Sequence, residues 1–305
     1  MEGVGESTLL TLGAARSGRR SRRMLIDLLF IGGLRAVALL SVVTVLAIIG
    51  VIIAKGLPTI SWSFLTSPPQ EGMTSGGIYP MIRGSVLLML GTLVIVLPIG
   101  VLGGVFLAEY AGQNVFSRFI HASVASLAGT PSVIFGLFGL AVFVIMMQMG
   151  VSLLAGCLTL ALFTLPAVVF TTENAIRSVP ESFIEAGMAL GLSRWQILWK
   201  IVLPNAMPGI LTGVVLSTGR AAGEAPPILL TAGIYYATGS LPRGWDILKQ
   251  PVANLPYHLA EGYRQGGVIP EAIVWGTCLT LMLFVLIINI WAIMVRVRVR
   301  RRQRW

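Results

Sequence analysis

The amino-acid sequence predicts an all-α, polytopic membrane protein with six transmembrane helices, and three observations support this. Of its 305 residues, 55% are hydrophobic and only 11% are charged, about half the charged fraction of an ordinary soluble domain. Five uncharged runs are long enough to cross a bilayer as a helix, which needs roughly 20 residues. Basic residues gather in alternate connecting segments, as expected when short cytoplasmic loops hold an excess of Lys and Arg.

The predicted spans follow directly from the runs without charge. The third run is long enough to cross twice, and the polar, glycine-containing break at Gln148, Gly150 and Ser152 is the expected position of its turn. The six helices are therefore expected within 36–54, 84–108, 119–172, 201–219 and 272–295.

Charge predicts the domain limits and the orientation. Residues 1–30 form a basic tail, of which 1–23 are expected to be unstructured; 31–295 form the membrane domain, and 296–305 form a second basic tail. With a cytoplasmic N-terminus, fifteen of the 22 Lys and Arg lie on the cytoplasmic side and five outside, so both termini are expected in the cytoplasm. The net charge of +10 then reflects contact with anionic membrane lipid and requires no nucleic acid.

The charged segment between the fourth and fifth spans predicts a helical hairpin on the cytoplasmic side. Its first helix is expected to begin at Glu181 and to end at Gly191, and Ser193 is expected to cap the second. An apolar face at helical spacing runs along the first helix through Phe183, Ala186 and Leu190.

This hairpin resembles the EAA loop of the permease subunits of binding-protein-dependent ABC importers. The matching positions are Glu185, Ala186, Gly187, Gly191, Ile201, Leu203 and Pro204. The resemblance implies a type I importer permease fold, in which 173–205 is the coupling loop that fits a groove on the ATPase subunit. The pattern usually has alanine at Gly187, and we expect this glycine to leave the small surface that a close partner needs. An ordinary amphipathic connector between spans is the alternative.

The chain is not expected to be an enzyme or to hold a cofactor or metal. A phosphate-binding P-loop needs glycine immediately before its lysine, whereas Lys55, Lys200 and Lys249 follow Ala, Trp and Leu. The two cysteines, Cys157 and Cys278, lie in apolar runs and are expected to be core thiols. ATP is therefore expected to be hydrolysed by another polypeptide.

A charged pair interrupts the apolar sequence of the fifth span. Arg220 lies sixteen residues beyond Pro204, about 24 Å along a regular helix, and so falls in the far half of the membrane. Because an arginine facing lipid is costly, we expect a protein-lined, hydrated cavity around it, with Glu224 one turn further on. A structural ion pair that ties two spans together is the alternative.

The stretch RAAGEAPPILLTA at 220–232 resembles RAxGExAPLLLTA of phosphate-importer permeases, and 76–110 and 250–263 resemble parts of their PstA-type subunit. The departures are Ala225, where threonine is usual, and Pro226, where alanine is usual. The resemblance implies that Arg220 and Arg177 lie on the substrate pathway, although anchoring beside the inner leaflet explains Arg177 equally well. A guanidinium group binds phosphate oxygens in pairs, and Glu224 can hold it or accept a hydrogen bond from protonated phosphate.

The resemblance also implies the partners and the location. It predicts a bacterial inner-membrane assembly of this chain with a homologous second permease, a dimer of ATP-binding subunits and an extracytoplasmic phosphate-binding protein, with inorganic phosphate as cargo. Two alternatives stay open: a permease for another oxyanion such as sulfate or molybdate, which would share the EAA loop, and a channel or secondary carrier that needs no motor. A membrane enzyme is disfavoured because the sequence offers no catalytic cluster.

Overall fold

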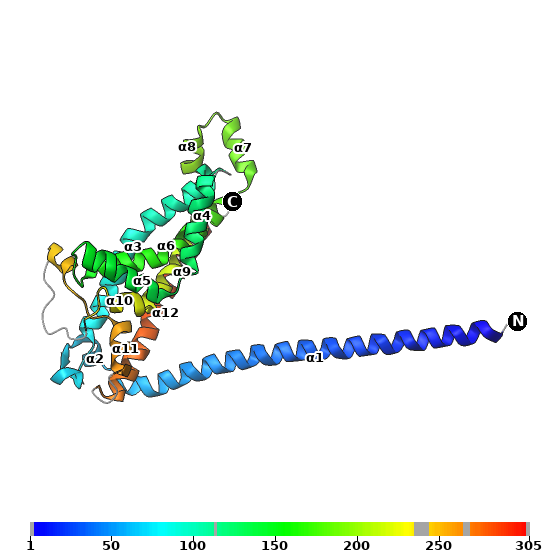
Figure 1. The fold of residues 1–305 in the computed structure, drawn as a ribbon, viewed down its shortest axis with the longest axis horizontal. Helices are drawn as coiled ribbons and strands as arrows, with labels where there is room; N and C mark the ends of the chain where they lie inside the picture. The colour runs from blue at the N-terminus through cyan, green and yellow to red at the C-terminus, as the bar shows by residue number, and fades with distance from the viewer. Residues whose placement is uncertain (1–2, 113–114, 235–243, 265–268, 303–305) are drawn as a thin grey trace. The chain divides into compact units, whose positions relative to one another are not determined.

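The computed structural model describes residues 3–112, 115–234, 244–264 and 269–302, and these are mainly helical (Figure 1). The elements in chain order are α1 (Gly3–Gly56), η1 (Leu57–Thr59), α2 (Trp62–Thr66), β1 (Pro69–Gln70), η2 (Glu71–Met73), β2 (Ser75–Gly76), α3 (Tyr79–Val105), η3 (Phe106–Tyr110), α4 (Val115–Ala128), α5 (Ser132–Gly139), η4 (Leu140–Met146), α6 (Leu153–Arg177), α7 (Glu181–Ala189), α8 (Arg194–Ile197), η5 (Leu198–Val202), α9 (Leu203–Gly223), α10 (Pro226–Leu229), η6 (Gly244–Lys249), α11 (Leu255–Arg264) and α12 (Glu271–Arg302). The two short strands pair antiparallel.

The chain divides into two units, Met1–Ala54 and Lys55–Trp305. The first consists of α1, which is helical from Gly3. The expectation that residues 1–23 are unstructured is therefore wrong for 3–23. No proline precedes Pro58, so nothing in this sequence interrupts the backbone hydrogen bonds of a long helix.

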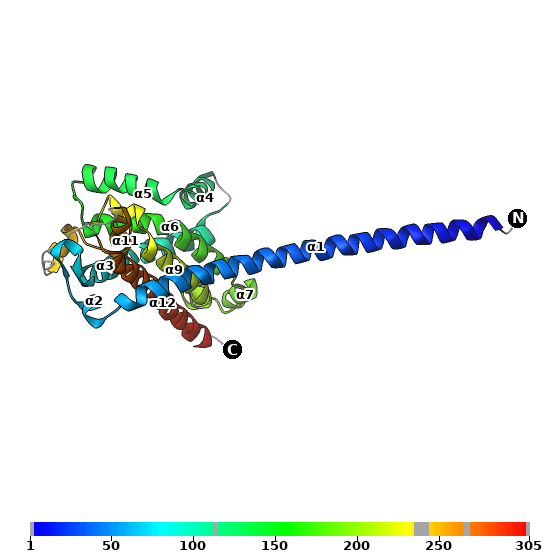
Figure 2. The ribbon, with the colours of Figure 1, turned by 90° about the horizontal axis from the view of Figure 1, so that it is seen from below.

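The second unit is built around α6. This helix packs between α3 and α9, and α12 packs against α9; in Figure 2, α4 and α5 lie on one side of α6 and α12 on the other. Two thirds of the residues in the most apolar stretch of α6 are buried. Glycines allow the close approach, because a Cβ at Gly100 would lie 2.6 Å from a methyl carbon of Val168. The helix that carries Arg177 is thus the most buried of the candidate spans in the described residues.

The third predicted span is bent. The helices α4 and α5, the latter continued by η4, meet at 105° across a break of at most four residues, where Gly129 and Pro131 interrupt the helix. The described residues hold five helices long and apolar enough to span a membrane, or six if this bent pair is one span. The predicted turn is confirmed, since Gln148 and Gly150 have φ of 54° and 66° and Ser152 caps the start of α6.

The segment after α9 closes the end of the bundle at which α6 begins. The backbone N–H groups of Ser152 and Leu153 donate to the carbonyl oxygens of Thr231 and Gln250, at 2.9 and 2.8 Å. The short helix α10 packs against α5 and α6, and α11 packs against α12. These backbone contacts hold the segment that follows Arg220 and Glu224 against the start of α6.

The buried His258 predicts a dependence of stability on pH. Its side chain in α11 is 3% exposed, and burial lowers its pKa from 6.5 to about 4. Between these values the unfolded chain binds a proton that the folded chain does not, so stability falls as pH drops from 6.5 towards 4. The loss reaches about 3 kcal/mol for a shift of this size.

In detergent, the apparent melting temperature is expected to fall between pH 7 and pH 5, and His258→Gln is expected to flatten that slope whatever it does to stability at pH 7. An unchanged slope in this variant would show that His258 does not cause the dependence.

Candidate functional site

The predicted pair Arg220 and Glu224 is brought together at the C-terminal end of α9. Arg220 Nε lies 3.7 Å from Glu224 Oε1, and its guanidinium carbon lies 4.6 Å from the ring centre of Phe163 on α6. Glu224 is not on the helix as expected; it follows the last turn in an extended conformation. The helix ends here because Pro226 and Pro227 lack the N–H groups that would continue it.

The two side chains of this pair differ in exposure. Arg220 is 58% exposed and Glu224 19%, while Ser217, Thr218 and Ala221 on the same helix are buried. Arg220 therefore lies on the surface of the helix bundle, and the described residues of this chain do not enclose it in the expected cavity. A guanidinium held on one side by a carboxylate and a ring face keeps N–H groups free for an anion.

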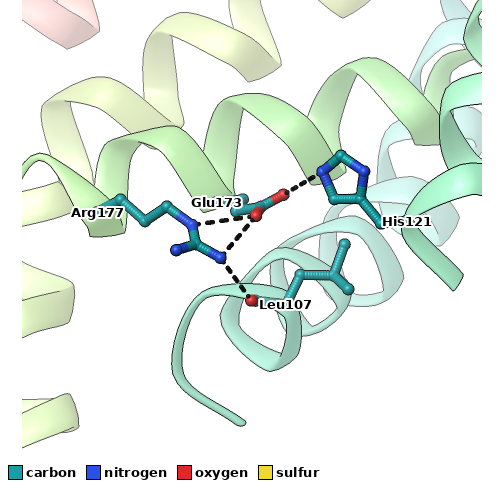
Figure 3. Close-up of polar contacts among 4 residues, drawn as sticks. All are labelled: Leu107, His121, Glu173 and Arg177. Carbon is teal, nitrogen blue, oxygen red and sulfur yellow. Dashed lines mark hydrogen bonds and ion pairs between the residues drawn. The ribbon is translucent and has the colours of Figure 1, made fainter. Parts of the chain in front are cut away.

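Arg177 lies in a second polar cluster, in the last turn of α6 (Figure 3). Its Nε and Nη2 contact Glu173 Oε1 at 3.1 and 3.0 Å, and Nη2 also donates to the Leu107 carbonyl oxygen at 3.2 Å. On the other side of the carboxylate, His121 Nε2 from α4 lies 3.6 Å from Glu173 Oε2. The cluster joins the end of α6 to η3 and α4.

This cluster borders a cavity of about 400 Å³. The cavity is lined by Leu107, Ala111, Gly112, Ser117, Arg118, His121, Glu173 and Arg177. Glu173 is only 7% exposed, whereas the side chains of Arg177 and His121 are 56% and 52% exposed. The buried carboxylate of Glu173 thus holds the side chains of Arg177 and His121, which are more exposed, at the cavity wall.

The two predicted pathway arginines do not meet. Phe163, which contacts Arg220, precedes Arg177 by fourteen positions on α6, which is about 21 Å along a regular helix. One anion therefore cannot contact both arginines at once, and a transported anion would meet them at two separate positions.

The predicted hairpin is confirmed in its local structure and protrudes at one end of the bundle (Figure 1). Gly191 has a φ of 76°, and the N–H groups of Gly191 and Leu192 donate to the carbonyl oxygens of Met188 and Gly187, which is a glycine-terminated helix end. Ser193 and Gln196 form a capping box at the start of α8.

The motif residues divide between the surface and the interior of the hairpin. Glu185 and Ala186 are exposed, and so are Phe183 and Leu190, at 46% and 79%; the predicted apolar face therefore points outward. Leu203 is buried in a core that joins α8, η5 and α9 to the ends of α3 and α6.

Gly187 has a different role from the one expected. It is buried, and a Cβ added to it would lie 2.8 Å from Ile201 Cδ1 and 3.1 Å from Ile197 Cγ1. The expectation that it offers a small surface to a partner is wrong, because it packs against the second half of its own hairpin.

Gly187→Ala is expected to fold and to keep its activity, because the nearest atom is the end of a flexible side chain. The gain in helix propensity is about 1 kcal/mol, less the cost of moving Ile201. Gly191→Ala, by contrast, should cost about 1 kcal/mol through its left-handed backbone. Melting temperatures of the two variants provide the measurement, and an equal fall in both would contradict this assignment.

Sequence reasoning missed Glu173, His121 and Leu107. The spacing of Glu173 and Arg177 at i, i+4 is a usable signal for an ion pair on a helix. By contrast, His121 lies 52 positions before Glu173 and Leu107 contributes only a backbone carbonyl, so no local pattern points to them. Among the residues described, no group of three or more His, Cys, Asp or Glu is placed to hold a metal ion.

Residues 100–303 match the family model described as binding-protein-dependent transport system inner membrane component. Phosphate transport system permease protein PstA of Haemophilus influenzae is 34% identical over 239 residues, covering 78% of this chain and 82% of the relative. The probable ABC transporter permease protein YqgI of Bacillus subtilis is 35% identical over 253 residues, covering 78% and 84%. PstA 2 of Mycobacterium tuberculosis is 33% identical over 289 residues and 93% of each chain.

Two solved structures share the fold. A bacterial ABC transporter that imports the acidic polysaccharide alginate matches with a TM-score of 0.64 at 16% identity, over 90% of this chain and 99% of that chain. The inward-facing MetNI methionine ABC transporter matches with a TM-score of 0.54 at 21% identity, over 73% and 94%. At these identities the likeness concerns the arrangement of helices.

Proposed function

Because this chain belongs to the family of binding-protein-dependent transport system inner membrane components, we propose that it is the permease subunit of an ATP-driven importer of inorganic phosphate. It is a multi-pass protein of the inner membrane and a transport subunit, and a separate subunit hydrolyses the ATP. Relatives named as phosphate permeases are similar to it over most of their length, which supports phosphate as the cargo.

The observation that carries the proposal is the course of α9. This helix begins with Leu203, packed in the hairpin core, and ends at Arg220 and Glu224. A displacement of the hairpin is therefore passed along one helix to the charged pair. In this proposal Glu185 and Ala186 contact the ATPase, while Gly187, Gly191, Ile201, Leu203 and Pro204 shape the hairpin and join it to the bundle.

The charged pair is suited to a transported anion, which must bind and then be released. Arg220 offers N–H groups to phosphate oxygens, and Glu224 reduces the net charge so that the anion is released. Phosphate near neutral pH retains one or two protons and can donate a hydrogen bond to Glu224, whereas sulfate has none to donate. Arg177 acts further along the same pathway.

The exposure of Arg220 supports a second permease as the opposite wall of the pathway. The complete assembly would hold this chain, a homologous permease, two ATP-binding subunits and an extracytoplasmic phosphate-binding protein. Residues 31–295 form the membrane domain, and the tails 1–30 and 296–305 face the cytoplasm, where their basic side chains meet anionic lipid. The hairpin lies on the same side, within reach of the ATPase.

The test is uptake by the complete assembly in proteoliposomes. Labelled phosphate should accumulate only with ATP and binding protein present, and excess sulfate or molybdate should not compete. Competition by sulfate or molybdate would favour a permease for another oxyanion. Equal uptake without ATP or without the ATPase would favour a channel or secondary carrier and would overturn the proposal.

A further inference from the structure

We propose that the cavity beside Arg177 is a second oxyanion site, at which inorganic phosphate binds on the hairpin side of the bundle before release. The proposal rests on the proposed function for the identity of its ligand. It adds Arg118, His121 and Glu173 to the residues that contact phosphate.

The cavity has the size and walls of a binding site. Its volume of about 400 Å³ is formed by three separate elements: the end of η3, the start of α4 and the end of α6. One phosphate fits together with several waters, since a water molecule takes about 30 Å³. Ala175 and Ile176 lie between Glu173 and Arg177 on α6 and belong to the hairpin core, so the cavity wall and that core share one turn of this helix.

The charges of the lining residues favour an anion. Arg118 and Arg177 stand against a single carboxylate, Glu173, which leaves one net positive charge before any contribution from His121. Arg118 is exposed. In Arg177, Nε and Nη2 are engaged by Glu173 and Leu107, and Nη1 points away from both (Figure 3). Arg177 is thus held in a fixed orientation with N–H donors still facing outward.

Glu173 supplies the selectivity. Its Oε1 accepts from Arg177, while its Oε2 lies 3.6 Å from His121 Nε2, longer than an ordinary hydrogen bond. Oε2 can therefore accept a hydrogen bond from a protonated oxygen of phosphate. Sulfate has no proton to donate and would meet only repulsion from this carboxylate.

A purely structural ion pair, which ties α6 to η3, is the competing explanation. It predicts that changes at Glu173 alter stability without altering the choice between anions. It also predicts that Arg118 has no part in binding, since the described contacts show no ion pair between Arg118 and the cluster. The two explanations differ in what the variants bind.

Binding is measured on the assembled permease pair with its ATPase subunits in nanodiscs, without the binding protein, using radiolabelled inorganic phosphate. Every complex carries Arg220→Gln, which removes the other candidate site. Saturable binding is expected, and Arg118→Gln should weaken it roughly tenfold or more, since a hydrogen bond to a charged group is lost. Because Arg118 is exposed, this variant should assemble normally, which co-elution of the subunits checks.

Glu173→Gln should let unlabelled sulfate displace phosphate, which it should not do otherwise. No saturable binding, unchanged binding in Arg118→Gln, or an unchanged response to sulfate in an assembled Glu173→Gln complex would each overturn the second site. Normal phosphate uptake by the unmodified assembly alongside such a result leaves the proposed function intact. Loss of phosphate specificity in that uptake assay overturns the proposed function itself.

Discussion

Replacing Arg220 by glutamine is expected to reduce phosphate uptake by roughly a hundredfold, the loss expected when a charge-assisted contact to an anion is removed. Glutamine keeps a polar side chain of similar length but loses the charge and the planar fork. Because Arg220 is 58% exposed and its ion pair is 3.7 Å long, the variant should still fold and assemble. Uptake by reconstituted assemblies, with co-elution of all subunits, provides the measurement.

Arg264 offers a matched control. It is 70% exposed and pairs with Glu261 at 3.1 Å, and it lies in the last turn of α11, not on α9. Arg264→Gln removes the same charge and a shorter ion pair and should leave uptake within about twofold of the unmodified assembly, as surface ion pairs contribute little. Arg220→Lys should be intermediate, since it keeps the charge without the fork. Full uptake by Arg220→Gln would remove this residue from the pathway.

Ala186→Arg is expected to abolish ATP-dependent uptake by separating the permease from its ATPase. Ala186 is exposed on α7, so the larger side chain leaves the hairpin core unchanged. It would, however, fill the space that a closely packed partner needs, and overpacking an interface of this kind costs about 1–3 kcal/mol or more. Loss of the ATP-binding subunit from the purified complex provides the measurement.

Ala186→Ser separates the effect of size from that of any change at this position. Serine adds one oxygen and should retain both the ATPase subunit and most of the uptake. If Ala186→Arg also retains both, α7 is not the surface that the ATPase contacts.

The spans could be predicted from the sequence because burial in lipid requires long uncharged runs, and α3, α6, α9 and α12 follow those runs. The sequence was less informative where backbone geometry decides the outcome. The break between α4 and α5 falls at Gly129 and Pro131, but a helix can also continue through a proline inside an apolar run, as α6 does at Pro166. Packing against neighbouring helices decides between the two.

The contacts of the candidate site also differ in how far the sequence could predict them. Arg220 and Glu224 are four positions apart, and their pairing could be predicted from that spacing, although Glu224 lies just beyond the end of the helix. The contact of His121 with Glu173 depends on how α4 folds back across α6, which no local spacing encodes. The inward orientation of Gly187 was missed because a small residue fits a partner's surface and a tight internal contact equally well; only the positions of Ile197 and Ile201 distinguish them.

The unbroken run of helix from Arg194 to Gly223 converts a small rotation at one end into a larger displacement at the other end. From Leu203 to Arg220 the distance is about 26 Å at 1.5 Å per residue, so a pivot of only about 10° at one end sweeps the other through about 4.5 Å. That sweep exceeds the 3.7 Å between Arg220 and Glu224. A small rotation at the hairpin end of this helix is therefore large enough to re-aim the guanidinium group at its other end.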